Sequence, residues 1–337
     1  MIDFVGKRLW FYIFSMLIIL PGLVSLLLPD GLRQGIEFSS GTTFTLRFAE
    51  PVGEDALRSA LAELGHAGAR IQKTAEGRLL VRTDLIEGAS EAPPFGPALP
   101  SEREELETAL QERFGPLLDS DGNVANRFLE FSSVSPSVSS DIGRNAALAV
   151  VAASVAILIY ITLTFASVPK PIRYGASAIF ALAHDILVVL GAASILGRLF
   201  DFEIDTLLIT ATLTIVGFSV HDSIVVFDRV RENVRRAEAA GLDVRLADAV
   251  NASLNQTLGR SLNTSITVVL TLVALILLGG ETIRDFLVIM LIGLVSGTYS
   301  SIFVASQALV SWDEGDLPRF LRRFSSGGRA TAGEATT

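Results

Sequence analysis

The chain has 337 residues, of which half are hydrophobic and only 19% are charged, and its mean hydropathy is +0.50. Soluble domains carry about 25% charged residues, so this composition indicates an integral membrane protein. The net charge of −9 argues against nucleic-acid binding. The absence of cysteine excludes disulfides and thiolate metal sites, and a three-histidine zinc site would use every histidine in the chain. No metal, cofactor or catalytic residue is therefore expected.

Six apolar stretches are long enough to cross a bilayer, which takes about 20 residues. They are Trp10–Leu28, Ala146–Phe165, Tyr174–Leu196, Thr206–Phe227, Leu262–Leu278 and Phe286–Val310. The first could instead be a secretory signal peptide. Its apolar run is longer than the usual signal-peptide core, and no small-residue cleavage site follows it.

The distribution of lysine and arginine predicts the orientation, because these residues concentrate in cytoplasmic loops. With the N-terminus inside, 14 of them lie in inside segments, and only Arg198 and Arg284 lie in short outside loops. Both termini are therefore expected in the cytoplasm. The segment Pro29–Arg144 holds 19 acidic and 11 basic residues, a net charge of −8, and follows the first span on the outer side.

The outer segment has the pattern of a small α/β domain. Strands are expected at Thr43–Phe48, Ala69–Lys73, Leu79–Thr83 and Phe128–Val134, and helices at Glu54–Leu64 and Ser101–Phe114. Ser101 and Glu104 have the spacing of a capping box. The order βαββαβ is that of the ferredoxin-like split motif. Residues 89–100, with three prolines, are expected to form a loop.

Four segments follow from this reading: residues 1–28, with a cytoplasmic N-terminus and the first span; residues 29–144, a periplasmic domain; residues 145–310, a five-helix membrane body with a cytoplasmic loop at 228–260; and residues 311–337, a cytoplasmic tail. The loop is expected to hold a solvated or interfacial helix pair. The tail from Ser325 is rich in Gly, Ala and Thr, which is typical of disorder.

Ionisable residues inside a bilayer are costly and usually mark a functional path. The third span contains His184 and Asp185, and the fourth contains His221 and Asp222. Burial disfavours a charged carboxylate, so Asp222 could load and release a proton near physiological pH. Arg260 opens the fifth span. Each residue also has a structural alternative: His184 and Asp185 as a hydrogen-bonded pair, His221 as a partner of a buried neighbour, and Arg260 as a membrane-edge anchor.

Polar and small residues follow stripes on these spans. Thr210, Thr214, Gly217 and His221 share one stripe, with Ser219 and Asp222 beside it, and Thr264, Thr267 and Thr271 follow Arg260 at helical spacing. The sixth span carries Gly293 and Gly297, a pair that allows close helix contact. The sequence predicts that the stripes of Asp185, Asp222 and Arg260 would face lipid without a second protein, although the threonines could simply serve packing.

Several motifs together resemble the SecF family of bacterial protein export. Residues 217–233 (GFSVHDSIVVFDRVREN) are similar to the family signature, and so are residues 255–265 (NQTLGRSLNTS). The signature positions include Gly217, Ser219, Asp228, Arg229, Asn255, Gln256 and Thr264. Residues 35–42 (GIEFSSGT) are similar to the family's GxDFxGGT, with Glu37 and Ser40 as departures, and His221 replaces the common Asn.

This resemblance implies an RND-like half with six spans, a partner called SecD that supplies a second half, and association with SecYEG and YajC. It implies that the protein uses the proton gradient to promote translocation of polypeptide across the bacterial plasma membrane. Asp222 and Arg260 match the family's proton-pathway residues, and His221, Asp185 and His184 are candidates for the same pathway.

Two other functions are open at this point. Half of an RND-type efflux or lipid transporter would share the architecture, although such transporters usually have larger outer domains and both halves in one chain. An intramembrane aspartyl protease could use Asp185 and Asp222, but its GxGD signature is absent because Val220-His221 precede Asp222 and Ala183-His184 precede Asp185. The sequence does not decide between proton and sodium coupling.

Overall fold

The computed structural model describes residues 2–29, 31–74, 77–86, 101–125, 127–280 and 283–315. The loop predicted at residues 89–100 and the tail predicted from Ser325 lie outside this part of the chain. The described residues form two compact units, and each is described by itself. One comprises residues 1–33, 148–203 and 207–337, and the other comprises residues 34–147 and 204–206.

Six helical segments of the described chain are long and apolar enough to cross a membrane, which confirms the six predicted spans. They are α1 (Arg8–Leu27), α5 (Pro136–Thr164), α6 (Ile172–Phe200), α7 (Thr206–Ala239), α8 (Leu246–Leu278) and a sixth that begins with α9 (Arg284–Ser300). The sixth continues through a π-helical turn, η2 (Ser301–Ala305), into α10 (Ser306–Glu314). The protein is therefore a multi-pass membrane protein.

Small residues bring α1 and α6 into close contact. A Cβ atom added to Gly22 of α1 would lie 2.7 Å from the Cα of Gly191 in α6. One turn further on, Ser25 and Ser194 share a 2.7 Å hydrogen bond between their hydroxyls. The two helix backbones can approach this closely because neither glycine carries a side chain.

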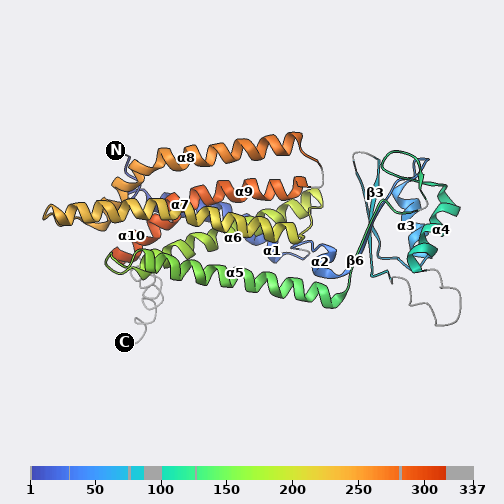
Figure 1. The fold of residues 1–337 in the computed structure, drawn as a ribbon, viewed down its shortest axis with the longest axis horizontal. Helices are drawn as coiled ribbons and strands as arrows, with labels where there is room; N and C mark the ends of the chain where they lie inside the picture. The colour runs from blue at the N-terminus through green and yellow to red at the C-terminus, as the bar shows by residue number, and fades with distance from the viewer. Residues whose placement is uncertain are drawn as a thin grey trace, which may run out of the picture. The chain divides into compact units, whose positions relative to one another are not determined.

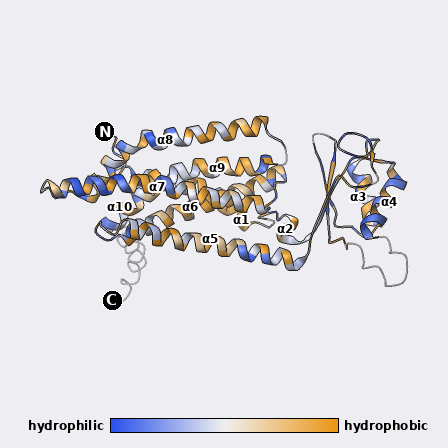
Figure 2. Ribbon diagram, viewed as in Figure 1, coloured by the Kyte–Doolittle hydropathy of each residue, from blue (hydrophilic) through white to orange (hydrophobic). Residues whose placement is uncertain are grey.

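An aromatic cluster fills the interior between α5, α6 and α7. Phe165 and Tyr174 stack at 5.4 Å between ring centroids, and Phe227 packs edge-on against both rings. All three side chains are almost fully buried. Large apolar residues on the outer faces of α1, α5 and α8 are exposed, among them Leu163 and Leu270, and Figure 2 shows apolar colour over much of α5 and over part of α8. Lipid is the solvent that such faces require.

The stretch between the fourth and fifth spans is helical, as predicted, but its two helices are extensions of the spans themselves. The loop at residues 228–260 was expected to hold a solvated or interfacial helix pair, and in the structure α7 continues to Ala239 and α8 begins at Leu246. The change from apolar to charged residues marks the edge of the membrane segment, and it does not end either helix because the charged residues are good helix formers. Figure 1 shows both helices without a break over these residues.

The second unit contains a four-stranded antiparallel sheet in the order β2-β3-β1-β6. Its strands are β1 (Gly41–Leu46), β2 (Arg70–Lys73), β3 (Leu79–Thr83) and β6 (Glu130–Val134). With the helices α3 (Glu54–Glu63) and α4 (Glu102–Phe114), this order and connectivity form the predicted ferredoxin-like split motif. Ser101 caps α4, and Glu104 completes the capping box as predicted.

Apolar residues of the sheet and both helices form the core of this unit. Phe44, Leu57, Leu61, Val81 and Leu110 are fully buried in it. Two elements of this unit were not predicted: the one-turn helix α2 (Ile36–Ser39) and a short hairpin of β4 (Leu117–Leu118) and β5 (Val124–Ala125). These elements are too short to produce a periodic pattern in the sequence.

Candidate functional site

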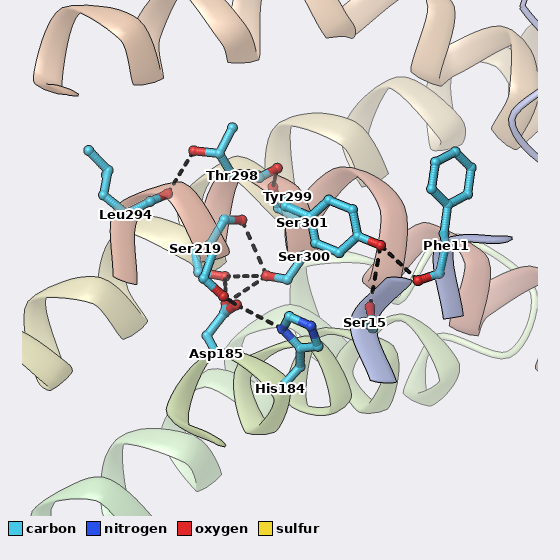
Figure 3. Close-up of polar contacts among 12 residues, drawn as sticks. Phe11, Ser15, His184, Asp185, Ser219, Leu294, Thr298, Tyr299, Ser300 and Ser301 are labelled. Carbon is cyan, nitrogen blue, oxygen red and sulfur yellow. Dashed lines mark hydrogen bonds and ion pairs between the residues drawn. The ribbon is translucent and has the colours of Figure 1, made fainter. Parts of the chain in front are cut away.

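Asp185 lies at the centre of the membrane unit, and serine side chains from two other helices surround its carboxylate. Ser219 of α7 donates to Oδ2 at 2.7 Å, Ser300 of α9 donates to the same atom at 2.6 Å, and Ser296 donates to Oδ1 at 2.8 Å. The carboxylate side chain is 1% exposed. Figure 3 shows Ser219 and Ser300 converging on it. Asp185 therefore links α6, α7 and α9 inside this chain.

His184 lies beside this carboxylate. Its Nδ1 atom is 3.2 Å from Oδ1 of Asp185, and its ring packs near that of Tyr299. Its Nε2 atom is buried and has no hydrogen-bond partner among the described residues. Tyr299 donates to the backbone carbonyl of Phe11 and accepts from Ser15, both on α1 (Figure 3). The contacts fit the predicted hydrogen-bonded pair of His184 and Asp185.

Hydroxyl groups from two other helical segments, α8 and η2, also surround the carboxylate of Asp222. Ser261 of α8 donates to Oδ1 at 2.6 Å, and Ser301 at the start of η2 donates to Oδ2 at 2.6 Å. Asp222 is 7% exposed. No cation pairs with it among the residues that the structure describes. A hydroxyl group can donate to a charged carboxylate or accept from a neutral one, so this site suits either protonation state.

The expectation that Asp185 and Asp222 would face lipid is wrong. Both carboxylates point into the bundle of this chain, where α9 and η2 supply their serine partners. The sequence could not show this, because the donors come from residues 34 to 115 positions away along the chain. No role was predicted for Ser261, Ser296, Ser300 or Ser301. Polar residues at helical spacing in an apolar sixth span were the only signal available for three of them.

Arg260 and His221 do lie on the outside of the chain. Both are exposed, and no ion pair joins Arg260 to Asp222 or to any other carboxylate among the described residues. The stripes around them are exposed as well. These are Thr210, Thr214 and Gly217 on α7, and Asn263, Thr264, Thr267 and Thr271 on α8. The hydroxyls of Thr214, Thr264, Thr267 and Thr271 donate to carbonyls of their own helices. Arg260, His221 and Asn263 add further polar groups to this surface.

The glycines of the sixth span place α9 against α7. A Cβ atom on Gly293 would clash with Cδ1 of Ile215, and one on Gly297 would lie 3.2 Å from Cβ of Ser219. The pair thus allows the approach that lets Ser219 and Ser300 reach one carboxylate. This supports the predicted helix contact.

Most of the remaining signature residues connect the C-terminal end of α7, the N-terminal part of α8 and the N-terminus of the chain. Arg229 donates to Gln256 and pairs with Glu232, and Asp228 pairs with Arg231. Asn255 exchanges two hydrogen bonds with the backbone of Ile2. These contacts hold helix ends together, and they place the signature residues outside the carboxylate sites, apart from Ser219. Among the described residues, no cluster of His, Asp and Glu is arranged to hold a metal ion.

The fold and its two buried carboxylates define a class: a six-span membrane protein with a ferredoxin-like domain after the first span and titratable groups inside the bundle. The sequence matches "Protein export membrane protein SecD/SecF, C-terminal" over residues 118–315 and the SecD/SecF GG motif over residues 30–52. The chain belongs to the SecD/SecF family of protein export membrane proteins.

Relatives with curated names agree with this assignment. The chain is 45% identical to the protein translocase subunit SecF of Thermobaculum terrenum, over 98% of this chain and all of that protein. It is 37% identical to SecF of Anaerolinea thermophila, over 96% of this chain and 98% of that protein. It is also 36% identical to the protein translocase subunit SecDF of Thermus thermophilus, over 84% of this chain but 35% of that longer protein.

A solved structure has the same fold. The crystal structure of SecDF, a translocon-associated membrane protein from Thermus thermophilus, aligns with a TM-score of 0.72 and 32% identity. The alignment covers 93% of this chain and 39% of that chain. In that relative, the region similar to this chain is thus part of one longer SecDF polypeptide.

Proposed function

We propose that this chain is the SecF subunit of a SecDF complex that uses the proton motive force to promote translocation and release of polypeptide across the bacterial plasma membrane. The observation that carries the proposal is the match to a named SecF over the full length of that relative. Relatives are named as transport components, so we infer that the chain has no enzymatic activity. An efflux or lipid transporter half is less well supported, because each of the named relatives is a translocase subunit.

The carboxylate sites support proton coupling. Asp222 is buried, has only hydroxyl partners among the described residues and lies inside a membrane helix. Because serine hydroxyls can serve both of its protonation states, the site can release and rebind a proton without a large rearrangement. Moving one charge through 100 mV is worth about 2.3 kcal/mol, so a few protons can drive a conformational change of several kcal/mol. Asp185 and His184 extend the proposed pathway.

Arg260 enters the proposal as a group that moves. It is not paired with Asp222 in this structure, and it lies on the same helix as Ser261, the donor to Oδ1. We infer that approach of the guanidinium, in a second state of the complex, favours the charged carboxylate and expels its proton. His221 is exposed on α7 and is available to the same surface.

The exposed polar surface of α7 and α8 supports a SecD partner. His221, Arg260 and Asn263 would each be costly to expose to lipid, and a second six-span protein would cover them. The Thermus relative fits this interpretation, since its single SecDF chain is much longer than the part that matches here. SecYEG, YajC and the translocating polypeptide are further proposed partners, on the resemblance alone.

A photo-crosslinking experiment tests the SecD contact. A crosslinking amino acid at Thr267 lies on the polar surface, and one at Leu163 lies on the exposed apolar face of α5 as a matched control. We expect Thr267 to crosslink to a second six-span protein in native membranes, identified by mass spectrometry, and Leu163 to give no such product. Equal yields at both positions, or no product at Thr267, would contradict the proposed interface.

The orientation and the role of the outer domain are also proposals. The excess of Lys and Arg in the inside segments places both termini in the cytoplasm and the ferredoxin-like domain in the periplasm, where we infer that it holds emerging polypeptide. Deletion of residues 35–135 should leave insertion and SecD pairing largely intact and abolish stimulation of export. Normal export by this deletion would contradict the role of the domain.

A further inference from the structure

Two neighbouring serines at one helix turn hold both buried carboxylates. Ser300, the last residue of α9, donates to Oδ2 of Asp185, and Ser301, the first residue of η2, donates to Oδ2 of Asp222, each at 2.6 Å. Both serines are fully buried. The carboxylates belong to different helices, α6 and α7, so the turn at 300–301 is the point where the two sites meet.

Each of these serines has a second acceptor within reach. The Ser300 hydroxyl is 3.2 Å from the carbonyl oxygen of Gly297, and the Ser301 hydroxyl is 3.1 Å from that of Thr298. A hydroxyl group carries one proton and donates one good hydrogen bond at a time. Each serine hydroxyl can therefore donate its hydrogen bond either to its carboxylate or to the backbone carbonyl of its own helix.

The charge of the carboxylate determines which acceptor the serine hydroxyl bonds to. A charged carboxylate accepts the stronger, charge-assisted bond, so the hydroxyl points to it. When Oδ2 takes up a proton, the new O–H bond donates to the serine oxygen, and the serine proton turns to the backbone carbonyl. In Asp222 the other oxygen, Oδ1, accepts from Ser261, whose hydroxyl has no second acceptor among the described residues. The proton is therefore best accommodated on Oδ2, facing Ser301.

The carbonyls that receive the serine protons lie directly before the π-helical turn. The Gly297 carbonyl already accepts the backbone N–H of Ser301, so an added bond from Ser300 changes the hydrogen bonding of the turn in which α9 passes into η2. π-helical turns inside α-helices occur frequently at functional sites. Protonation of either carboxyl group thus changes the hydrogen bonding of the same few backbone atoms.

We propose that Ser300 and Ser301 are positioning residues that donate to Asp185 and Asp222 when these are charged and turn to the Gly297 and Thr298 carbonyls when they are protonated, so that one helix turn responds to both sites. This inference rests on the proposed proton-carrying role of Asp222. It assigns a role to the serines and to the π-helical turn that the family resemblance does not supply.

We call this change of acceptor by Ser300 and Ser301 the relay. Infrared spectroscopy of the full chain, in the complex in which it purifies, tests it without an export assay. Carboxyl C=O bands are followed against pH, and the bands absent from Asp222→Asn and Asp185→Asn assign the two sites. Ser301→Ala removes one donor to the charged form of Asp222 and should move the midpoint of the Asp222 band upward by about one pH unit. Ser300→Ala should do the same to the Asp185 band.

Two further variants separate the relay from general packing. Ser301→Cys keeps the size of the side chain and a weak donor, so its shift should lie between those of the wild type and Ser301→Ala. Ser306→Ala is the matched control, because Ser306 is fully buried in the next turn and its hydroxyl has no partner among the described residues. It should move neither midpoint.

The outcomes distinguish the two proposals. An Asp222 band that titrates but does not respond to Ser301→Ala, or that responds equally to Ser306→Ala, overturns the relay and leaves the proposed function standing. A shift in Ser301→Ala together with gradient-dependent export by Asp222→Asn would overturn the proton-carrying role of Asp222 and, with it, the relay as a part of proton coupling. Absence of any Asp222 band between about pH 4 and pH 9 overturns both.

Discussion

The contact of α1 with α6 should be unusually sensitive to a single methyl group. In Gly22→Ala or Gly191→Ala, the new Cβ would lie 2.7 Å from the Cα of the facing glycine. The clashing atom belongs to a backbone, so no side-chain rotation relieves it. The two helices must separate by about 1 Å to restore ordinary van der Waals contact.

The expected loss of unfolding free energy follows from the contacts that this separation of the helices breaks. Overpacking costs about 1–3 kcal/mol, and the 2.7 Å bond between Ser25 and Ser194 lies one turn away, where a loss adds about 0.6 kcal/mol in a membrane protein. Arg198 also donates to Ser25. We expect either variant to lose about 2–3 kcal/mol of unfolding free energy.

The assay is denaturation of the purified chain by SDS titration in mixed micelles, followed by circular dichroism. Gly259→Ala is the matched control: this glycine is inside α8, and a Cβ there would have no neighbour within 4 Å. Because alanine favours a helix over glycine, the control should be neutral or slightly stabilised. If Gly22→Ala behaves like Gly259→Ala, the close packing of α1 against α6 is not as described.

Two other predictions concern a surface ion pair and an exposed histidine. The side-chain hydrogen bond from Arg113, together with the positive charge of its guanidinium, lowers the pKa of Glu63. The stabilisation by this carboxylate is therefore present above its unfolded-state pKa of about 4.3, and it is lost as pH falls through the lower pKa of the folded state. Glu63→Gln should therefore be less stable than the wild type at neutral pH and equal to it at strongly acidic pH in urea titrations. The matched control is Glu112→Gln on α4, the helix that carries Arg113. His221→Asn should export normally, because His221 is exposed and donates no hydrogen bond among the described residues; a loss of export comparable to that of Asp222→Asn would give His221 a direct role.

Local signals in the sequence were sufficient to predict the outer domain. Ser101 and Glu104 mark the start of α4 through a capping box whose geometry involves only four consecutive residues. The strand predicted at Leu79–Thr83 is β3 of the structure, with the same bounds. The sheet order then follows from the βαββαβ connectivity, because the split motif allows few arrangements.

The inner arrangement of the carboxylates could not be predicted in the same way. Helical spacing puts Ala178, Ala181 and Asp185 on one face of α6, and all three are buried. Spacing alone does not say whether such a face meets the same chain, a partner or lipid. That depends on where α9 and η2 pack, and therefore on Gly293, Gly297 and the serines that follow them.

The most direct test of the account is export of a reporter by cells that carry Asp222→Asn, measured with and without a collapsed proton gradient. The amide keeps the size of the side chain. Its oxygen can accept from one of the two serines that contact Asp222, Ser261 and Ser301, and its NH2 group can donate to the hydroxyl oxygen of the other, but it cannot titrate. A sodium ionophore in a parallel arm separates sodium from proton coupling. We expect the variant to fold and pair with SecD, and its export to fall to the level of wild-type cells with a collapsed proton gradient. Export by Asp222→Asn that still depends on the proton gradient would show that Asp222 is structural and would contradict the proposed proton pathway.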